Sequence, residues 1–222
     1  MERRYDWVVF DLDGTLLDTL RDVADACNAV LSDHGFPTHP VWDYRYFIGN
    51  GAETLLRRTL PRGTDGGLMA RALGEYRERY KAHALDTTCA YLNLPAVLER
   101  LQTAGVRLAV LSNKDQGDVE NVIARLCPPV FTAVRGGRRG VPYKPDPTAL
   151  NALLDDLGAD KGRTLFVGDS GVDMETAKNA GVASCGVLWG FREREELAAA
   201  GAEHIVRAPE ELAQIVWGDG EG

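Results

Sequence analysis

Cysteine and histidine are scarce in this 222-residue sequence, which has four of each. The cysteines stand singly, without a Cys-x-x-Cys pair, and the histidines show no spacing typical of a metal site. We therefore expect neither a disulfide framework nor a zinc site, and free thiols in a reducing compartment are the simpler interpretation. The eight positions are Cys27, Cys89, Cys127, Cys185, His34, His39, His83 and His204.

Long apolar runs and an excess of positive charge are also absent. No apolar stretch approaches the roughly 18 residues of a membrane span, and no signal-peptide segment precedes the first expected strand. The formal net charge of −8 argues against nucleic acid or an anionic membrane as the main partner. The hydrophobic content of 45% is enough for a substantial core, and we expect a cytoplasmic protein.

One stretch near the N-terminus combines a strand pattern with two acids. Val8, Val9 and Phe10 form the short apolar run of a strand buried on both faces, and Asp11 and Asp13 follow directly. In extended backbone two residues spaced i, i+2 project to the same side, so both carboxylates are predicted to face one point beyond the strand. Gly14 then permits a sharp turn, in which the Thr15 hydroxyl is expected to take part. An ordinary turn rich in Asp is the alternative.

A calcium loop is the other use of this Asp-x-Asp-Gly pattern. An EF-hand loop needs further oxygen ligands and a closing Glu at its twelfth position. Here Leu16, Leu17 and Leu20 follow instead. The sequence therefore does not predict an EF-hand at this place.

The order of the remaining patterns predicts an α/β fold with an insertion. Residues 19–85 contain only helical or loop patterns, beginning with a capping box at Thr19-Leu20-Arg21-Asp22. From about residue 86, helical and strand patterns alternate regularly. We therefore predict a doubly wound parallel sheet from residues 1–18 and 86–222, with 19–85 as an inserted all-helical domain. The glycine-rich end, 218–222, is expected to lack regular structure.

Polar residues follow the expected strands at the edge where such sheets bind ligands. Ser112 and Asn113 end the strand that starts at Val106, Asp169 follows the strand from Thr164 to Val167, and Lys144 precedes a helix. Four carboxylates are predicted to converge there and to need a divalent cation. Oxygen-only ligands favour a hard divalent cation, and a site shared with a phosphate would favour Mg²⁺ over Ca²⁺. For 168–173 alone, a helix N-cap rich in acids is an equal alternative. The four acids are Asp11, Asp13, Asp169 and Asp173.

Together these pieces resemble the haloacid dehalogenase (HAD) superfamily of phosphatases. The string Asp11 to Thr15 is similar to its first motif, Val110 to Asn113 to its second, Lys144-Pro145 to its third and Gly168 to Asp173 to its fourth. The resemblance covers nearly the whole chain, and the helical insertion lies where phosphoglycolate phosphatases carry a cap. Phe47-Ile48-Gly49-Asn50-Gly51-Ala52 resembles the cap segment of the bacterial enzymes, although a Gly-Asn turn before a helix is its plainer interpretation.

The resemblance implies a role for each motif residue. Asp11 is expected to be the nucleophile that forms an aspartyl-phosphate, and Asp13 the general acid and base. The expected Mg²⁺ ligands are Asp11, the Asp13 main-chain carbonyl and Asp169, with Asp173 as ligand or support. Ser112 and Lys144 are expected to hold the phosphoryl oxygens and Asn113 to orient them or the loop. Gly49 and Asn50 are expected to contact the substrate.

The family resemblance leaves the substrate open. A Mg²⁺-dependent phosphomonoester hydrolase acting on 2-phosphoglycolate is the leading hypothesis. A phosphatase for nucleotides, sugar phosphates or pyrophosphate, a β-phosphoglucomutase-like mutase and a receiver-like phosphate-sensing module are the alternatives. The expected partner is a small phosphorylated metabolite, and the protein is expected to be a monomer or homodimer. The roles of Arg45, Lys114, Arg138 and Arg139 stay undecided.

Overall fold

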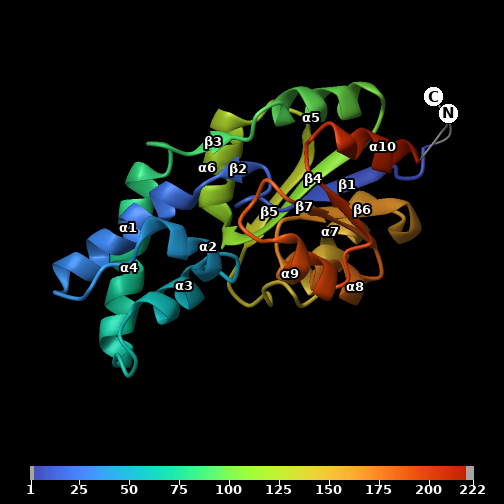
Figure 1. Cartoon of the computed structure of the whole chain (residues 1–222). Helices are drawn as coiled ribbons and strands as arrows, with labels where there is room; N and C mark the ends of the chain where they lie inside the picture. Colours follow the sequence, from blue (N-terminus) through green and yellow to red (C-terminus); the bar gives the residue numbers. More distant parts are fainter. Residues whose placement is uncertain (1–2, 219–222) are drawn as a thin grey trace.

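A parallel sheet of six strands organises one end of the molecule in the computed structural model, which describes residues 3–218 (Figure 1). Its strands are β1 (Trp7–Phe10), β4 (Arg107–Asp115), β5 (Phe131–Gly137), β6 (Thr164–Gly168), β7 (Ala183–Val187) and β8 (His204–Val206). The order is β5-β4-β1-β6-β7-β8, with every neighbouring pair parallel. The predicted doubly wound parallel sheet is confirmed.

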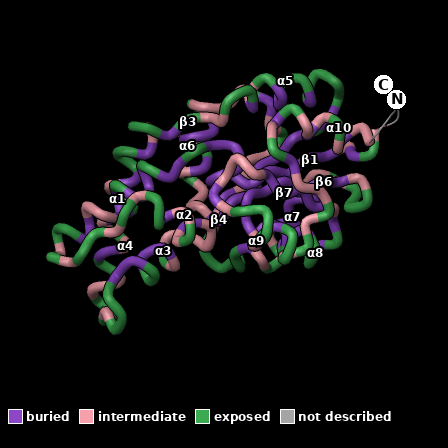
Figure 2. Tube along the Cα trace, in the orientation of Figure 1, coloured by how far each residue is buried: buried purple, intermediate pink, exposed green. Residues whose placement is uncertain are grey.

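Helices cover both faces of this sheet, because alternate strand residues project to opposite sides. Val8 and Phe10 join one hydrophobic cluster with α5 (Leu94–Thr103), α6 (Gln116–Leu126) and α10 (Glu211–Trp217). Val9 joins a second cluster with α7 (Thr148–Leu157) and α8 (Gly171–Ala180). Two short elements, η2 (Lys161–Arg163) and α9 (Arg194–Ala199), complete this part. Buried residues accordingly concentrate along the strands in Figure 2.

The strand order reverses at β1, which places a crevice at its carboxyl end. The chain adds β4 and β5 on one side of β1 and β6, β7 and β8 on the other. Such a switch point is where open α/β sheets bind ligands, because the connections on its two sides leave in opposite directions. Asp11 is the first residue after β1 and thus stands at this point.

Four helices make up the predicted insertion, residues 19–85, here called the cap segment. They are α1 (Leu20–Asp33), α2 (Tyr44–Phe47), which follows the short η1 (Val41–Asp43), α3 (Ala52–Thr59) and α4 (Gly66–His83). In Figure 1 they project from the sheet to one side, and α1, α3 and α4 pack against one another. The described part of the cap segment contains no strand, as the sequence predicts. Its status as a separate domain stays a prediction.

The two crossings between cap segment and sheet lie side by side. β2 (Leu17–Asp18) and β3 (Cys89–Ala90) form an antiparallel ribbon, with Leu17 opposite Ala90 and Asp18 opposite Cys89. The sequence does not reveal this ribbon, because two-residue strands have no measurable periodicity. It joins the segment's two ends in one place.

The capping box predicted at Thr19 to Asp22 is wrong. Thr19 makes no side-chain cap bond to α1, and its hydroxyl donates instead to Asp13 Oδ1 over 2.6 Å. The buried Asp22 carboxylate accepts from the main-chain N–H and hydroxyl groups of both Thr87 and Thr88, at 2.6 to 3.1 Å. Although burial alone would raise the pKa of Asp22, these bonds outweigh it and hold the pKa below its usual value. Both predicted capping groups thus connect distant parts of the chain.

One predicted boundary also differs from the structure, because β4 does not end at Asn113 but continues to Asp115. Beside it, β5 runs to Gly137. A side chain at Gly136 would approach the Lys114 carbonyl oxygen to 2.7 Å and the Gln116 Cα to 2.6 Å, so glycine permits the close approach of β5 to the end of β4 and the start of α6. No helix among residues 3–218 is long and apolar enough to cross a membrane. The predicted ends of the core at residues 1 and 222, and the tail from 219, lie outside the described residues.

Candidate active site

A cavity lies between the carboxyl ends of β1 and β4 and the cap segment. Asp11, Asp13 and Ser112 line it from the sheet side, and Gly49 and Tyr80 from the cap segment. The centre of a water molecule can move through about 40 Å³ of this cavity, which leaves room for only a few waters. With the helices in this arrangement, the cavity suits a small ligand.

Three buried carboxylates meet at the base of this region. Oxygens of Asp11, Asp169 and Asp173 all lie within 4.8 Å of one another, and the three residues are 1 to 6% exposed. Three acids this close cannot all be ionised without a compensating positive charge. Carboxylate oxygens without nitrogen or sulfur donors suit a hard divalent cation such as Mg²⁺. The donor set therefore fits the expected metal.

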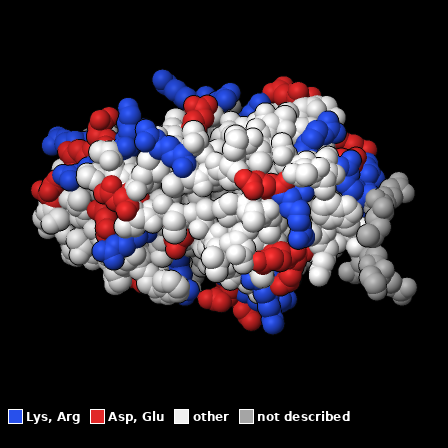
Figure 3. Space-filling model, turned by 90° about the horizontal axis from the view of Figure 1, so that it is seen from above, with Lys and Arg blue, Asp and Glu red and all other residues white. Residues whose placement is uncertain are grey.

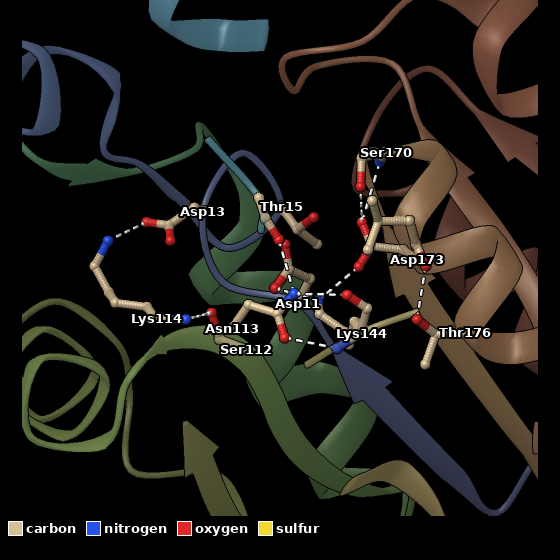
Figure 4. A network of polar contacts seen from close by, with 12 residues as sticks. Asp11, Asp13, Thr15, Ser112, Asn113, Lys114, Lys144, Ser170, Asp173 and Thr176 are labelled. Atoms are coloured by element: carbon tan, nitrogen blue, oxygen red, sulfur yellow. Dashed lines mark hydrogen bonds and ion pairs between the residues drawn. The ribbon is translucent and has the colours of Figure 1, made fainter. Parts of the chain in front are cut away.

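Lys144 supplies part of that positive charge. Its Nζ lies 2.7 Å from Asp11 Oδ1 and 2.7 Å from Asp173 Oδ1, as Figure 4 shows. Burial would lower the pKa of Lys144, but the two carboxylates outweigh it and raise the pKa. Burial also raises the pKa of Asp11, against the opposing effect of Lys144, and raises that of Asp169. The negative charge of the carboxylates is thus only partly compensated by the protein's own basic groups.

Asp169 is placed by glycines and a main-chain donor. Its Oδ2 accepts from the Phe191 N–H over 2.7 Å, and its Oδ1 from the Thr15 hydroxyl over 3.3 Å. A Cβ at Gly14, where φ is +83°, would lie 2.2 Å from Asp169 Oδ2, so only glycine permits this approach. The Thr15 hydroxyl, which the sequence predicts to stabilise the turn, is thus recorded in a bond with the acid that follows a different strand.

Asp173 combines a helix cap with the acidic cluster. Its Oδ2 accepts from the Ser170 N–H and hydroxyl groups in the capping box that begins α8. Its Oδ1 faces Lys144. The two interpretations of this motif are therefore compatible, because each carboxylate oxygen serves one of them.

The Asp13 side chain does not join the cluster of three, contrary to the prediction that four carboxylates converge. The chain turns after Phe10, so the extended i, i+2 geometry does not continue to Asp13. Asp13 Oδ1 accepts instead from the Thr19 hydroxyl and from Lys114 Nζ, which is 2.7 Å away. Figure 4 shows Asp13 turned toward Lys114, away from Lys144. Both Asp11 and Asp13 still line the cavity.

Lys114, left undecided by the sequence, is a largely buried partner of Asp13 in the site. Its side chain is 9% exposed, and its Nζ lies 4.5 Å from the centre of the Tyr80 ring. Burial would lower the pKa of Lys114, but the Asp13 charge outweighs it and raises the pKa. Tyr76 and Tyr80 also escaped the sequence analysis, although their i, i+4 spacing on a helical pattern marks one face.

Asn113 connects the site to the cap segment. Its Oδ1 accepts from the Lys144 N–H over 2.8 Å, and its Nδ2 donates to the Lys144 carbonyl and, over 2.8 Å, to the Gly49 carbonyl. The side-chain amide thus has both of its donors and its acceptor engaged. Ser112, also buried, accepts from the Lys114 N–H over 3.2 Å.

The cap loop places its glycines and Asn50 differently. Gly49 and Gly51 line the cavity, with φ of +113° and +82°. Asn50 is not among the lining residues, because its Oδ1 accepts from Arg58 over 2.8 Å. Arg45 packs over Trp42 and Tyr46, and it pairs with Glu193 across the cap boundary at 3.3 Å.

The surface arginines contribute elsewhere. Arg138 donates to Gln116 on the exposed surface, and neither Arg138 nor Arg139 forms an ion pair with another residue of the described range 3–218. The face drawn in Figure 3 shows basic groups interspersed with acidic ones. This mixture agrees with a solvated surface.

Comparison with known proteins covers the same residues. A family model described as haloacid dehalogenase-like hydrolase matches residues 8–187, a range from β1 to β7 that contains all the candidate site residues. The phosphoglycolate phosphatase of Pseudomonas syringae pv. tomato is 34% identical over 197 residues, which cover 86% of this chain and 72% of that protein. The phosphoglycolate phosphatase of Vibrio parahaemolyticus is 32% identical over 216 residues, covering 94% and 95%.

Solved structures show that the similarity extends through the cap segment. A crystal structure from Lactobacillus delbrueckii subsp. bulgaricus has a TM-score of 0.91 at 27% identity, covering 97% of this chain and 100% of that one. A predicted phosphoglycolate phosphatase from Haemophilus somnus has a TM-score of 0.86 at 26% identity, covering 96% and 98%. The sheet and the inserted helices are therefore shared as one arrangement.

Proposed function

Since this chain belongs to the haloacid dehalogenase-like hydrolase family, we propose that it is a Mg²⁺-dependent phosphatase whose substrate is 2-phosphoglycolate. The observation that carries the chemistry is the buried cluster of Asp11, Asp169 and Asp173, bridged by Lys144 at the switch point of the sheet. The small cavity beside it and the names of the similar bacterial enzymes support the choice of substrate.

The metal would be held by oxygens of the acidic cluster. In this proposal Asp11, Asp169 and the Asp13 main-chain carbonyl are ligands, and Asp173 is a ligand or supports one. Bound there, Mg²⁺ would neutralise charge and polarise the phosphoryl oxygens. Phe191 and Thr15 orient the Asp169 carboxylate for this purpose through their hydrogen bonds.

Asp11 and Asp13 would divide the chemistry between them. The Asp11 carboxylate attacks phosphorus in line and forms an O–P bond as the bond to the leaving oxygen breaks. Asp13 gives its proton to that oxygen. A water molecule then attacks the aspartyl-phosphate and loses its proton to Asp13, which releases inorganic phosphate and restores Asp11. Two buried acids with different partners suit two different roles.

The remaining residues would bind and orient the phosphoryl group. Ser112 and Lys144 donate to its oxygens, and the Lys144 charge opposes the negative charge that gathers around Asp11. Asn113 bonds to both the N–H and the carbonyl group of Lys144, so we assign it to positioning. Gly49 approaches the non-phosphate end of the substrate, and Asn50 contributes through the shape of the loop.

Small substrates are favoured over the alternatives for a physical reason. The cavity is small with the cap segment in place, so we propose that a nucleotide or hexose phosphate, with its larger leaving group, is a poorer substrate than a small ester. The proposal extends to residues 19–85 as a separate, substrate-selecting cap domain, and to the cytoplasm as the compartment. The proposed partner is the small phosphorylated substrate.

Turnover on a panel of esters tests the proposal. The purified protein with Mg²⁺ is assayed against 2-phosphoglycolate, hexose phosphates, nucleoside monophosphates and pyrophosphate. We expect multiple turnover, loss of activity in EDTA, and the highest kcat/KM for 2-phosphoglycolate. A higher kcat/KM for another ester would reject the substrate, and no turnover of any ester would reject the phosphatase.

A further inference from the structure

Acidic side chains outnumber basic ones in the wall of the cavity. Among the described residues that line it, Lys114 is the one base, whereas Asp11, Asp13, Asp115 and Asp118 are acids. An anionic group on the leaving side of a substrate therefore meets a single cation in this cavity. A neutral leaving group would have no need of one.

Lys114 is held in a fixed place with donors to spare. Its Nζ donates to Asp13 Oδ1 over 2.7 Å and lies above the Tyr80 ring. An ammonium group has three N–H donors. Asp13 accepts one of them, and a weaker contact joins Lys114 to the Tyr80 hydroxyl oxygen. At least one donor is thus available beside the acid that faces the leaving oxygen.

Tyr80 adds a second unused donor from the cap segment. It is 1% exposed, and the O–H of its hydroxyl has no hydrogen-bond acceptor among the described residues. Its ring is stacked on Tyr76, with centroids 5.9 Å apart, and both rings line the cavity. A buried O–H without an acceptor costs free energy, so this group points to a ligand that completes it.

We propose that Lys114 and Tyr80 together recognise a carboxylate on the leaving group, and so select phosphate esters of small hydroxy acids. This rests on the proposed phosphatase function. In 2-phosphoglycolate one methylene separates the leaving oxygen from the carboxylate. A leaving oxygen beside Asp13 therefore brings the carboxylate within reach of the Lys114 ammonium group, which is hydrogen-bonded to Asp13. A cation and a hydroxyl offer the charge-assisted bonds that a carboxylate accepts.

The neighbouring acids leave this site available. Asp115 is paired with Arg77 at 2.7 Å, and burial raises the pKa of Asp118. Lys114 comes from β4 and Tyr80 from α4, so recognition needs the cap segment in place over the sheet. A substrate carboxylate would therefore hold the two parts together.

The inference is tested by the ratio of the kcat/KM values for two esters of similar size. 2-Hydroxyethyl phosphate has nearly the size of 2-phosphoglycolate but a neutral end. We expect the wild type to prefer 2-phosphoglycolate, Lys114→Met to lower the ratio of kcat/KM values at least about 30-fold, and Tyr80→Phe about fivefold. Lys81→Met, the same change at the next position after Tyr80 but exposed, should leave the ratio unchanged.

The outcomes separate the inference from the function on which it rests. If both variants lower kcat/KM for the two esters by one factor, Lys114 serves Asp13 alone and the inference is wrong. A wild type without preference overturns it as well, whereas hydrolysis of neither ester rejects the phosphatase. Circular dichroism verifies folding, and Tyr80→Phe decides the question if Lys114→Met does not fold.

Discussion

The Asn113 side chain donates to the Gly49 carbonyl over 2.8 Å and thereby ties the sheet to the cap loop. The same amide also bonds to the Lys144 main chain, through the Lys144 carbonyl and N–H groups. A single residue thus relates the position of the cap loop to that of the lysine that we propose to bind the phosphoryl group. This coupling makes the first prediction specific.

Replacing Asn113 with Ala should lower kcat/KM about 10- to 100-fold, because Lys144 loses its orientation and a displacement of about 1 Å at a reacting group can cost about 100-fold in rate. Steady-state kinetics with 2-phosphoglycolate measures the loss. Asn121→Ala, on the exposed face of α6, is the control. Equal activity of the Asn113 variant and the wild type would contradict the positioning role.

Asp11→Asn should abolish turnover and leave the fold intact. Covalent transfer needs an ionised carboxylate, and the raised pKa of Asp11 shows that its charge is unfavourable in the metal-free fold. We therefore expect metal-free unfolding to cost about 1 kcal/mol more in the variant than in the wild type. Activity above a few per cent, without deamidation of the Asn, would exclude Asp11 as the nucleophile.

Metal binding should stabilise the protein more at neutral than at acidic pH. Asp11 and Asp169 have pKa values raised by burial, so their contribution to stability is present at low pH and is lost as the pH rises above about 4. Mg²⁺ reverses that loss because it binds the deprotonated carboxylates. The rise in Tm with Mg²⁺ should be larger near about pH 7.5 than near about pH 5.5.

Calcium gives the matching activity test. Its larger and more flexible coordination sphere should misplace Asp11 relative to phosphorus, so Ca²⁺ should inhibit. Full activity in EDTA, or equal activity with Ca²⁺, would count against the site.

Asp22→Asn should destabilise the fold by about 1–3 kcal/mol, because an amide cannot accept from all the donors of Thr87 and Thr88. The pKa of Asp22 is lowered, so its contribution is present above about pH 4 and is lost as the pH falls below it. Urea unfolding at two pH values measures this. Asp25→Asn, exposed on the same helix, is the control. Equal stabilities of both variants would show that the hydrogen bonds from Thr87 and Thr88 to Asp22 do not contribute to the free energy of unfolding.

Gly49→Val should lower kcat/KM for 2-phosphoglycolate at least tenfold, about 1.4 kcal/mol. The φ of +113° disfavours a β-branched residue, so the loop that lines the cavity must shift. p-Nitrophenyl phosphate should be affected less, since its large leaving group makes few specific cap contacts. Gly63→Val, at another positive φ in the cap segment with open space around it, is the control. An equal loss for both esters would assign the loop to folding alone.

The sheet could be predicted because its strands carry their own signal. Val8 to Phe10 and Thr164 to Val167 are short apolar runs, and parallel strands place the residues that follow them at one edge. That rule brings Asp11 and Asp169 together without any structure. It says nothing about the path after a turn, and for this reason the direction of the Asp13 side chain was predicted wrongly.

The partners of Thr19, Asp22 and Lys114 could not be predicted, because each lies in another part of the chain or depends on the placement of a helix. Thr19 and Asp22 match a local capping pattern, yet the structure uses their oxygens for contacts with Asp13 and with Thr87 and Thr88. A local pattern describes only what neighbours in sequence can do. Long-range competition for the same oxygen becomes visible only in three dimensions.

The β2–β3 ribbon would allow the inserted segment to be exchanged without disturbing the sheet. Leu17 lies opposite Ala90, so the chain departs and returns at one place whatever it does in between. The entropy of closing such a loop rises only with the logarithm of its length, by about 0.6 kcal/mol for each doubling. A longer, shorter or differently folded insertion would thus change the stability of the sheet little. The ribbon is therefore a point at which evolution or an engineer can exchange the inserted helices, to which we assign the choice of substrate, while the acidic cluster stays unchanged.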